Sequence, residues 1–149
     1  MGRLRYREDE VLDEAGNVRE AFYTIILVGT TRDREYDNSV MLTRSRYAAL
    51  ADRSLRFYRE YFKPDEELQV TKFRRRFHII YKETEFALNL DQLAEKVTGG
   101  YYLEIKSRTW SARDAEHKAE LIGELLVLLG AQVQDLLKFE YIDLAAKAA

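Results

Sequence analysis

Residues Glu67 to Trp110 decide the fold, and they read ELQVTKFRRRFHIIY (67–81), KET (82–84), EFALNLDQLAEKV (85–97), T (98) and GGYYLEIKSRTW (99–110). Three segments rich in β-branched and aromatic residues are separated by short polar or glycine breaks. This composition predicts three strands joined by tight connections.

Charged and polar residues occupy alternate positions along each of these strands. Since alternate side chains of a strand point to the same face, the strands are expected to present a charged face in place of the usual apolar one. The rows that share a face are Lys72, Arg74, Arg76 and His78; Asn89 and Asp91; and Tyr102, Glu104, Lys106 and Arg108.

The segments before this stretch predict a hairpin and a further strand. Arg3, Arg5 and Arg7 alternate with apolar residues, and a turn cluster at 13–17 leads into the β-forming segment 18–28. A third strand is expected at 35–43.

Two helices are expected. Apolar and aromatic residues recur at three- and four-residue spacing from Arg44 to Phe62, and Pro64 marks the end of that segment. Ser111 and Asp114 resemble a capping box that begins a second helix, with Gly130 as its stop.

The order β-β-β-α-β-β-β-α lacks the alternation of a parallel doubly wound sheet. It predicts a single α+β domain over residues 1–149, in which a curled antiparallel sheet forms a tunnel or partial barrel with helices packed outside. A curled sheet accommodates a charged face, because its inner side can be a wet cavity.

The overall composition of the chain limits the kinds of partner that it is expected to bind. The 149 residues suit one domain, and the net charge of -2 gives no bulk attraction to polyanions. The chain has no cysteine, which excludes disulfides and thiolate metal sites and suits a cytoplasmic location. No apolar run is long enough to span a bilayer, so no membrane partner is expected.

The basic rows predict an anion site. Arginine makes up 16 of the 24 basic residues, and its planar fork grips phosphate oxygens at two points. Cations repeated on two strands suit a triphosphate ligand. The alternative is that the same cations form salt bridges with acidic residues on an exposed strand face. The rows are Arg3, Arg5 and Arg7 on the opening strand and Lys72, Arg74 and Arg76 on the fourth strand. Of these, the predicted phosphate-binding residues are Arg5, Arg7, Lys72, Arg74 and Arg76.

The acids on the same strands predict a metal site. Carboxylate oxygens of Asp91 and Glu104 suit hard cations such as Mg²⁺ or Mn²⁺, although each acid could instead pair with a neighbouring arginine. No metalloprotease, Walker, dinucleotide or nucleophile-elbow motif occurs. The run TKFRRRFHIIYK mixes bases and aromatics as single-strand binders do, but the acidic balance disfavours nucleic acid as a partner.

Four short motifs occur in a characteristic order: Leu4-Arg5-Tyr6-Arg7, Lys72-Phe73-Arg74-Arg75, Leu90-Asp91-Gln92-Leu93 and Tyr102-Leu103-Glu104-Ile105. With the closing Tyr141-Ile142-Asp143-Leu144, they resemble the CYTH superfamily, also called triphosphate tunnel metalloenzymes. This group includes class IV-type adenylyl cyclases, thiamine triphosphatases and inorganic triphosphatases. The resemblance covers nearly the whole chain.

The resemblance implies a β-tunnel in which bases hold a triphosphate and acids hold one or two divalent cations. By position, it implies phosphate contacts for Arg5, Arg7, Lys72 and Arg74. Asp91 would line the tunnel, and Glu104 would be a metal ligand. The implied chemistry is that of a metal-dependent phosphohydrolase or adenylyl cyclase.

Three departures from the family pattern leave alternatives open. The chain lacks the opening ExExK strand, it carries Lys106 where the family has a second glutamate, and its second hairpin strand has no counterpart of the usual lysine. The missing strand could belong to a fused upstream domain or to a second copy in a homodimer. Otherwise the chain is expected to be a non-catalytic phosphate-sensing module of a larger protein.

Overall fold

The computed structural model describes residues 3–28, 34–37, 40–42, 45–94, 100–138 and 140–148. The chain divides into two compact units, residues 1–34 with 41–66 and residues 35–40 with 67–149, and each is described by itself. Each unit contains a three-stranded sheet whose neighbouring strands are antiparallel. The predicted α+β class is therefore confirmed.

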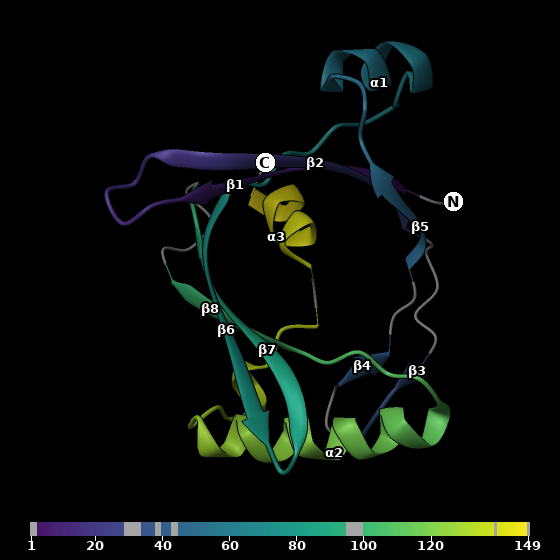
Figure 1. Cartoon of the computed structure of the whole chain (residues 1–149). Helices are drawn as coiled ribbons and strands as arrows, with labels where there is room; N and C mark the ends of the chain where they lie inside the picture. The colour runs from purple at the N-terminus through teal and green to yellow at the C-terminus, as the bar shows by residue number, and fades with distance from the viewer. Residues whose placement is uncertain are drawn as a thin grey trace. The chain divides into compact units, whose positions relative to one another are not determined.

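The first unit is built on the predicted hairpin. Strands β1 (Arg3–Leu12) and β2 (Val18–Val28) pair antiparallel, and β5 (Ser45–Leu50) joins the other edge of β2 (Figure 1). The Asp13 carboxylate accepts hydrogen bonds from the backbone N–H groups of Ala15 and Asn17, both at 2.9 Å. Gly16, with a φ of 86°, supplies the left-handed residue that this turn requires.

The prediction of one helix from Arg44 to Phe62 is wrong over its first half. Residues Ser45–Leu50 form strand β5, and only Leu55–Phe62 form helix α1; Arg44 itself lies outside the described residues. Pairing between β5 and the edge of β2 overrides the local helical spacing, because tertiary context outweighs weak propensities. Ser54 caps α1, and the helix ends at Phe62 ahead of Pro64, as predicted.

The strand predicted at 35–43 is also shorter than expected. The chain instead forms two strands of two residues each, β3 (Arg34–Glu35) and β4 (Met41–Leu42). Tyr36 donates its backbone N–H to the Val40 carbonyl at 2.8 Å. Thr43 lies outside the described residues.

The second unit contains the three strands predicted from the Glu67–Trp110 stretch. They are β6 (Lys72–Tyr81), β7 (Thr84–Leu93) and β8 (Tyr101–Lys106), in that spatial order. Lys82 and Glu83 form a two-residue turn in which both have positive φ, 46° and 61°. Such a turn matches the strand twist and pairs Tyr81 with Thr84, which sets the register of the hairpin.

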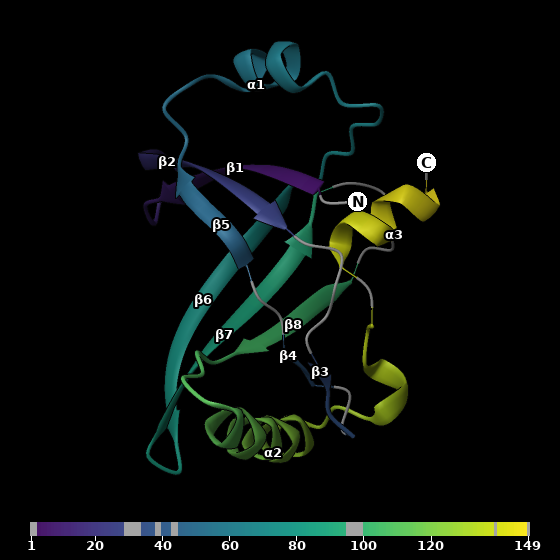
Figure 2. The same ribbon diagram turned by 90° about the vertical axis from the view of Figure 1, so that its right-hand side faces the viewer.

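Helix α2 (Ala112–Leu128) covers the apolar face of this sheet near the β6–β7 turn, while α3 (Tyr141–Ala148) lies toward the other end of the sheet (Figure 2). A short 3₁₀ turn, η1 (Val133–Asp135), lies between the two helices in the chain. Ser111 caps α2, and Gly130 follows its end with a φ of 79°, as the sequence predicts. The core consists of Phe86, Leu121 and Leu125, with Ile79, Tyr81, Leu88, Ile105 and Ile122 packed against them.

None of the helices in the described ranges is long and apolar enough to cross a membrane. Within each unit the sheet is open and three-stranded. The closed tunnel and the single-domain organisation therefore stay predictions.

Candidate anion-binding site on the second sheet

The register of the second sheet brings its charged rows onto one face. Arg74 lies opposite Asp91, which lies opposite Tyr102, and the next row joins Arg76, Asn89 and Glu104 in the same way. Helix α2 packs on the opposite, apolar face. The charged face predicted from the alternation of charged residues is therefore present in the structure.

Asp91 is the centre of this face, and its side chain is fully buried, with 0% exposure. The Arg74 guanidinium donates two hydrogen bonds to it, from Nε to Oδ1 and from NH2 to Oδ2, both at 2.6 Å. Lys72 Nζ adds a third contact to Oδ2 at 3.1 Å. Burial alone would raise the pKa of Asp91, but hydrogen bonds from Arg74, Lys72 and Tyr141 outweigh burial and lower this pKa to about 2. The carboxylate is therefore a fixed negative charge.

Glu104 is the second carboxylate, and both of its oxygens are engaged. Oε2 accepts hydrogen bonds from Arg74 at 2.7 Å and from the Asn89 amide at 3.1 Å. Oε1 lies 2.7 Å from Lys106 Nζ. Burial opposes ionisation here too, yet the contacts with Lys106, Arg74 and Asn89 hold the pKa of Glu104 below its ordinary value.

Arg76 lies at the exposed side of the same network. Its Nε donates to the Asn89 side-chain oxygen at 3.3 Å. Within the described ranges of the chain, no carboxylate pairs with Arg76. Its guanidinium is consequently the cation best placed to accept an external anion.

Tyr141 covers one side of the network from helix α3. Its hydroxyl donates to the Asp91 carboxylate, and its ring stands edge-on to Tyr102 with centroids 5.4 Å apart. Lys72 Nζ lies 4.7 Å from the centre of the Tyr141 ring, which is a cation–π distance. Burial and the bond to Asp91 raise the pKa of Tyr141, so the phenol stays protonated as a donor. Burial and the neighbouring Arg74 lower the pKa of Lys72, although Asp91 opposes this.

We call this connected set the charged cluster. The cluster contains four cationic side chains and two carboxylates, which leaves a formal net charge of +2 in a partly buried location. Such an excess favours an anionic ligand with several acceptor oxygens. The members are Lys72, Arg74, Arg76, Asn89, Asp91, Glu104, Lys106 and Tyr141.

The structure brings five of the seven predicted site residues together in this cluster: Lys72, Arg74, Arg76, Asp91 and Glu104. Arg5 and Arg7 lie on β1 in the first unit, where Arg7 pairs with Asp9 at 2.7 Å. The phosphate-binding role of these two arginines stays a prediction.

The donor set of the charged cluster does not fit a divalent cation as it is arranged. Every carboxylate oxygen already faces an ammonium or a guanidinium group. No group of three or more His, Asp or Glu side chains suitable for a metal occurs in the part of the chain that the structure describes. The expectation of Mg²⁺ or Mn²⁺ bound through Asp91 and Glu104 stays a prediction.

Sequence reasoning did not assign a site role to Asn89, Lys106 or Tyr141. The alternation that found Asp91 and Glu104 also places Asn89 and Lys106 on the same face, so these two were within its reach. Nothing in the local pattern around Tyr141 indicates a contact with Asp91, because that contact depends on where α3 packs.

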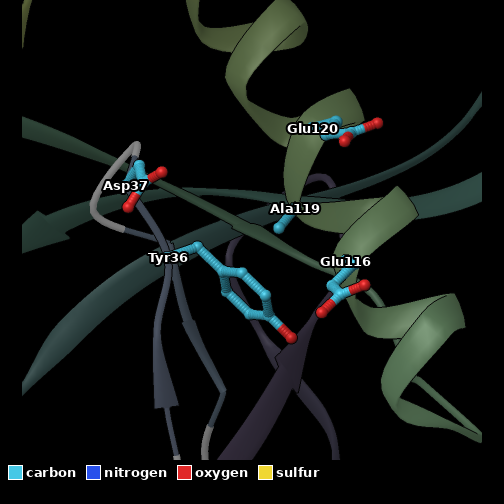
Figure 3. Close-up of a pocket in the computed structure, with 5 residues that line it drawn as sticks. All are labelled: Tyr36, Asp37, Glu116, Ala119 and Glu120. Carbon is cyan, nitrogen blue, oxygen red and sulfur yellow. The ribbon is translucent and has the colours of Figure 1, made fainter.

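A pocket elsewhere in the second unit has the opposite electrostatic character (Figure 3). Carboxylates dominate its wall, which repels phosphate, and none of the predicted site residues lines it. Its lining residues are Tyr36, Asp37, Glu116, Ala119 and Glu120.

Comparison of this chain with protein-family models, with curated proteins and with solved structures found no match. The resemblance to the CYTH superfamily therefore remains a prediction from the motifs.

Proposed function

We propose that this chain binds a triphosphate compound, either a nucleotide or an inorganic or organic triphosphate, at the charged cluster. One observation carries the proposal: the cluster holds four cations against two carboxylates, and Arg76 bonds only to the neutral Asn89 within the described residues. A triphosphate offers several charged oxygens within a short span, which matches an array of ammonium and guanidinium groups.

The pairing of both carboxylates with bases supports a binding role over a catalytic one. We therefore favour a non-catalytic phosphate-sensing module, working with an attached domain or with a second copy of the chain. The absence of cysteine supports a cytoplasmic setting. A metal-dependent triphosphatase or adenylyl cyclase is the other function that the motif resemblance implies.

The binding test uses two adjacent arginines with opposite orientations. Arg76 points to the charged face, whereas Arg75 lies on the face that carries Leu90 and Leu103, and both side chains are exposed. Arg76→Ala should weaken tripolyphosphate binding by about 1.5–3 kcal/mol, because it removes a charged contact. Arg75→Ala is the matched control and should leave binding unchanged.

Isothermal titration calorimetry and thermal melts with tripolyphosphate and ATP supply the readout, with sulfate at equal ionic strength as a control for general screening. Phosphate and cyclic-nucleotide release are measured in parallel samples containing Mg²⁺ or Mn²⁺. Binding without turnover supports the sensing module, and turnover would establish the enzyme in its place. Equal loss of binding in the Arg75 and Arg76 variants, or no binding at all, would refute the assignment of the site.

A further inference from the structure

Lys106 occupies a particular place in the charged cluster. It follows Glu104 by two positions on β8, so both side chains project from the same face of the strand. Its Nζ lies 2.7 Å from Glu104 Oε1, while Arg74 and Asn89 bond to Oε2. The two oxygens of Glu104 therefore face different cations on different sides.

Both oxygens of Asp91 also contact cations, but Lys106 is not one of them. Arg74 reaches both oxygens at 2.6 Å, and Lys72 lies 3.1 Å from Oδ2. Asp91 is fully buried, whereas the Glu104 side chain keeps 32% exposure. Glu104 is therefore the carboxylate that a cation from solvent could reach, and Lys106 covers the oxygen that Arg74 and Asn89 leave open.

An ammonium group and a divalent cation compete for such an oxygen. Mg²⁺ and Mn²⁺ bind carboxylates directly, and a neighbouring positive charge opposes their approach. A lysine tethered to the same strand is present at a fixed position, so it neutralises Glu104 without any dependence on metal concentration. The structure thus places the ammonium group of Lys106 directly against Glu104 Oε1.

We propose that Lys106 is a built-in counter-cation of Glu104 and that the charged cluster binds its triphosphate without a divalent metal. This inference rests on the function proposed above. The bases of the cluster contact phosphate oxygens directly, and the preferred ligand is the metal-free polyanion. Mg²⁺ in solution then competes with the protein for the ligand and lowers the measured affinity.

The first test measures the sign of the magnesium effect. Tripolyphosphate is titrated into the full chain in chelator and again in excess Mg²⁺, with KCl adjusted to equal ionic strength. Binding in chelator that is weakened by Mg²⁺ supports the inference. Binding that requires Mg²⁺ overturns the inference but leaves the proposed function standing, and absence of binding in both buffers overturns the proposed function itself.

The second test requires no phosphate ligand. Lys106→Glu places two acids two residues apart on the charged face, and Mn²⁺ binding is followed by electron paramagnetic resonance, with circular dichroism as the check on folding. We expect Mn²⁺ to bind this variant about tenfold or more tighter than the wild type.

Arg75→Glu is the control with the same change in net charge, located on the opposite face of the sheet. Lys106→Gln removes the cation without adding an acid and should give an intermediate Mn²⁺ affinity, even if Lys106→Glu fails to fold. Mn²⁺ affinity that stays at the wild-type level in every folded Lys106 variant overturns the role of Lys106. So does wild-type Mn²⁺ binding that Glu104→Gln abolishes.

Discussion

Replacing Asp91 by asparagine tests whether this carboxylate is a counter-charge or a ligand. The substitution preserves shape but removes the negative charge that Arg74 and Lys72 contact. The pKa of Asp91 falls from 3.8 to about 2, and this shift corresponds to about 2.4 kcal/mol in favour of the ionised form. Removing one partner of a buried ion pair costs about 3–5 kcal/mol. Because Arg74 keeps Glu104 at 2.7 Å, we expect a loss of stability near the lower limit of this range, about 3 kcal/mol.

The same substitution should act on binding in the opposite direction. Loss of the Asp91 charge raises the formal charge of the cluster from +2 to +3, and it releases Arg74 and Lys72 for an external anion. Tripolyphosphate affinity should therefore increase while the free energy of unfolding decreases. A metal ligand would behave differently, because its removal would lower both quantities.

Urea denaturation followed by far-ultraviolet circular dichroism gives the free energy of unfolding, and calorimetric titration in chelator and in excess Mg²⁺ gives the affinity. Glu85→Gln is the control, since Glu85 is exposed and lies on the same strand as Asp91. It should change stability by less than about 0.5 kcal/mol. Unchanged stability in the Asp91 variant, or a weaker affinity for tripolyphosphate, would contradict the counter-charge role.

Three further predictions follow from single features of the second unit. Because the pKa of folded Asp91 is about 2 against an ordinary 3.8, the stability that it contributes is complete above pH 3.8 and is lost as the pH falls toward 2. Acid titration by circular dichroism should show this loss in the wild type, and an identical profile in Asp91→Asn would disprove it. Phe86→Ala should cost about 3–5 kcal/mol, because Phe86 is 1% exposed in the core, whereas Phe73→Ala, at 60% exposure, should cost far less in the same urea experiment. Glu83→Gly should raise the melting temperature, because Glu83 has a φ of 61° that glycine adopts without strain. The control is Glu85→Gly in the adjoining strand, which should lower the melting temperature. A lower melting temperature in the Glu83 variant would argue against this turn.

Most of the correct predictions came from the composition of the strands and from the alternation of side chains along each strand. Alternation placed Arg74, Asp91 and Glu104 in the charged row of their respective strands, and the register of the sheet brings these rows together. The helix that starts after Ser111 was equally predictable from the sequence, because a side-chain cap and an apolar stripe are local signals.

Predictions failed where the local pattern suited two structures. The segment Ser45–Leu50 carries helical spacing, yet it forms β5 because β2 offers an edge with unpaired backbone groups. The site residue Tyr141 was missed for a related reason, since its role depends on where α3 packs against the sheet.

The sequence by itself determined which residues within each of β6, β7 and β8 share a face, because the alternation of side chains along a strand follows from backbone geometry alone. The tertiary structure alone decided what those residues do to one another. It placed Arg74 between two carboxylates, brought Tyr141 to Asp91 from the end of the chain, and set Lys106 against Glu104. The physical reason is that the ionisation and free coordination sites of a carboxylate depend on neighbours within a few ångströms, and folding selects those neighbours from distant parts of the chain.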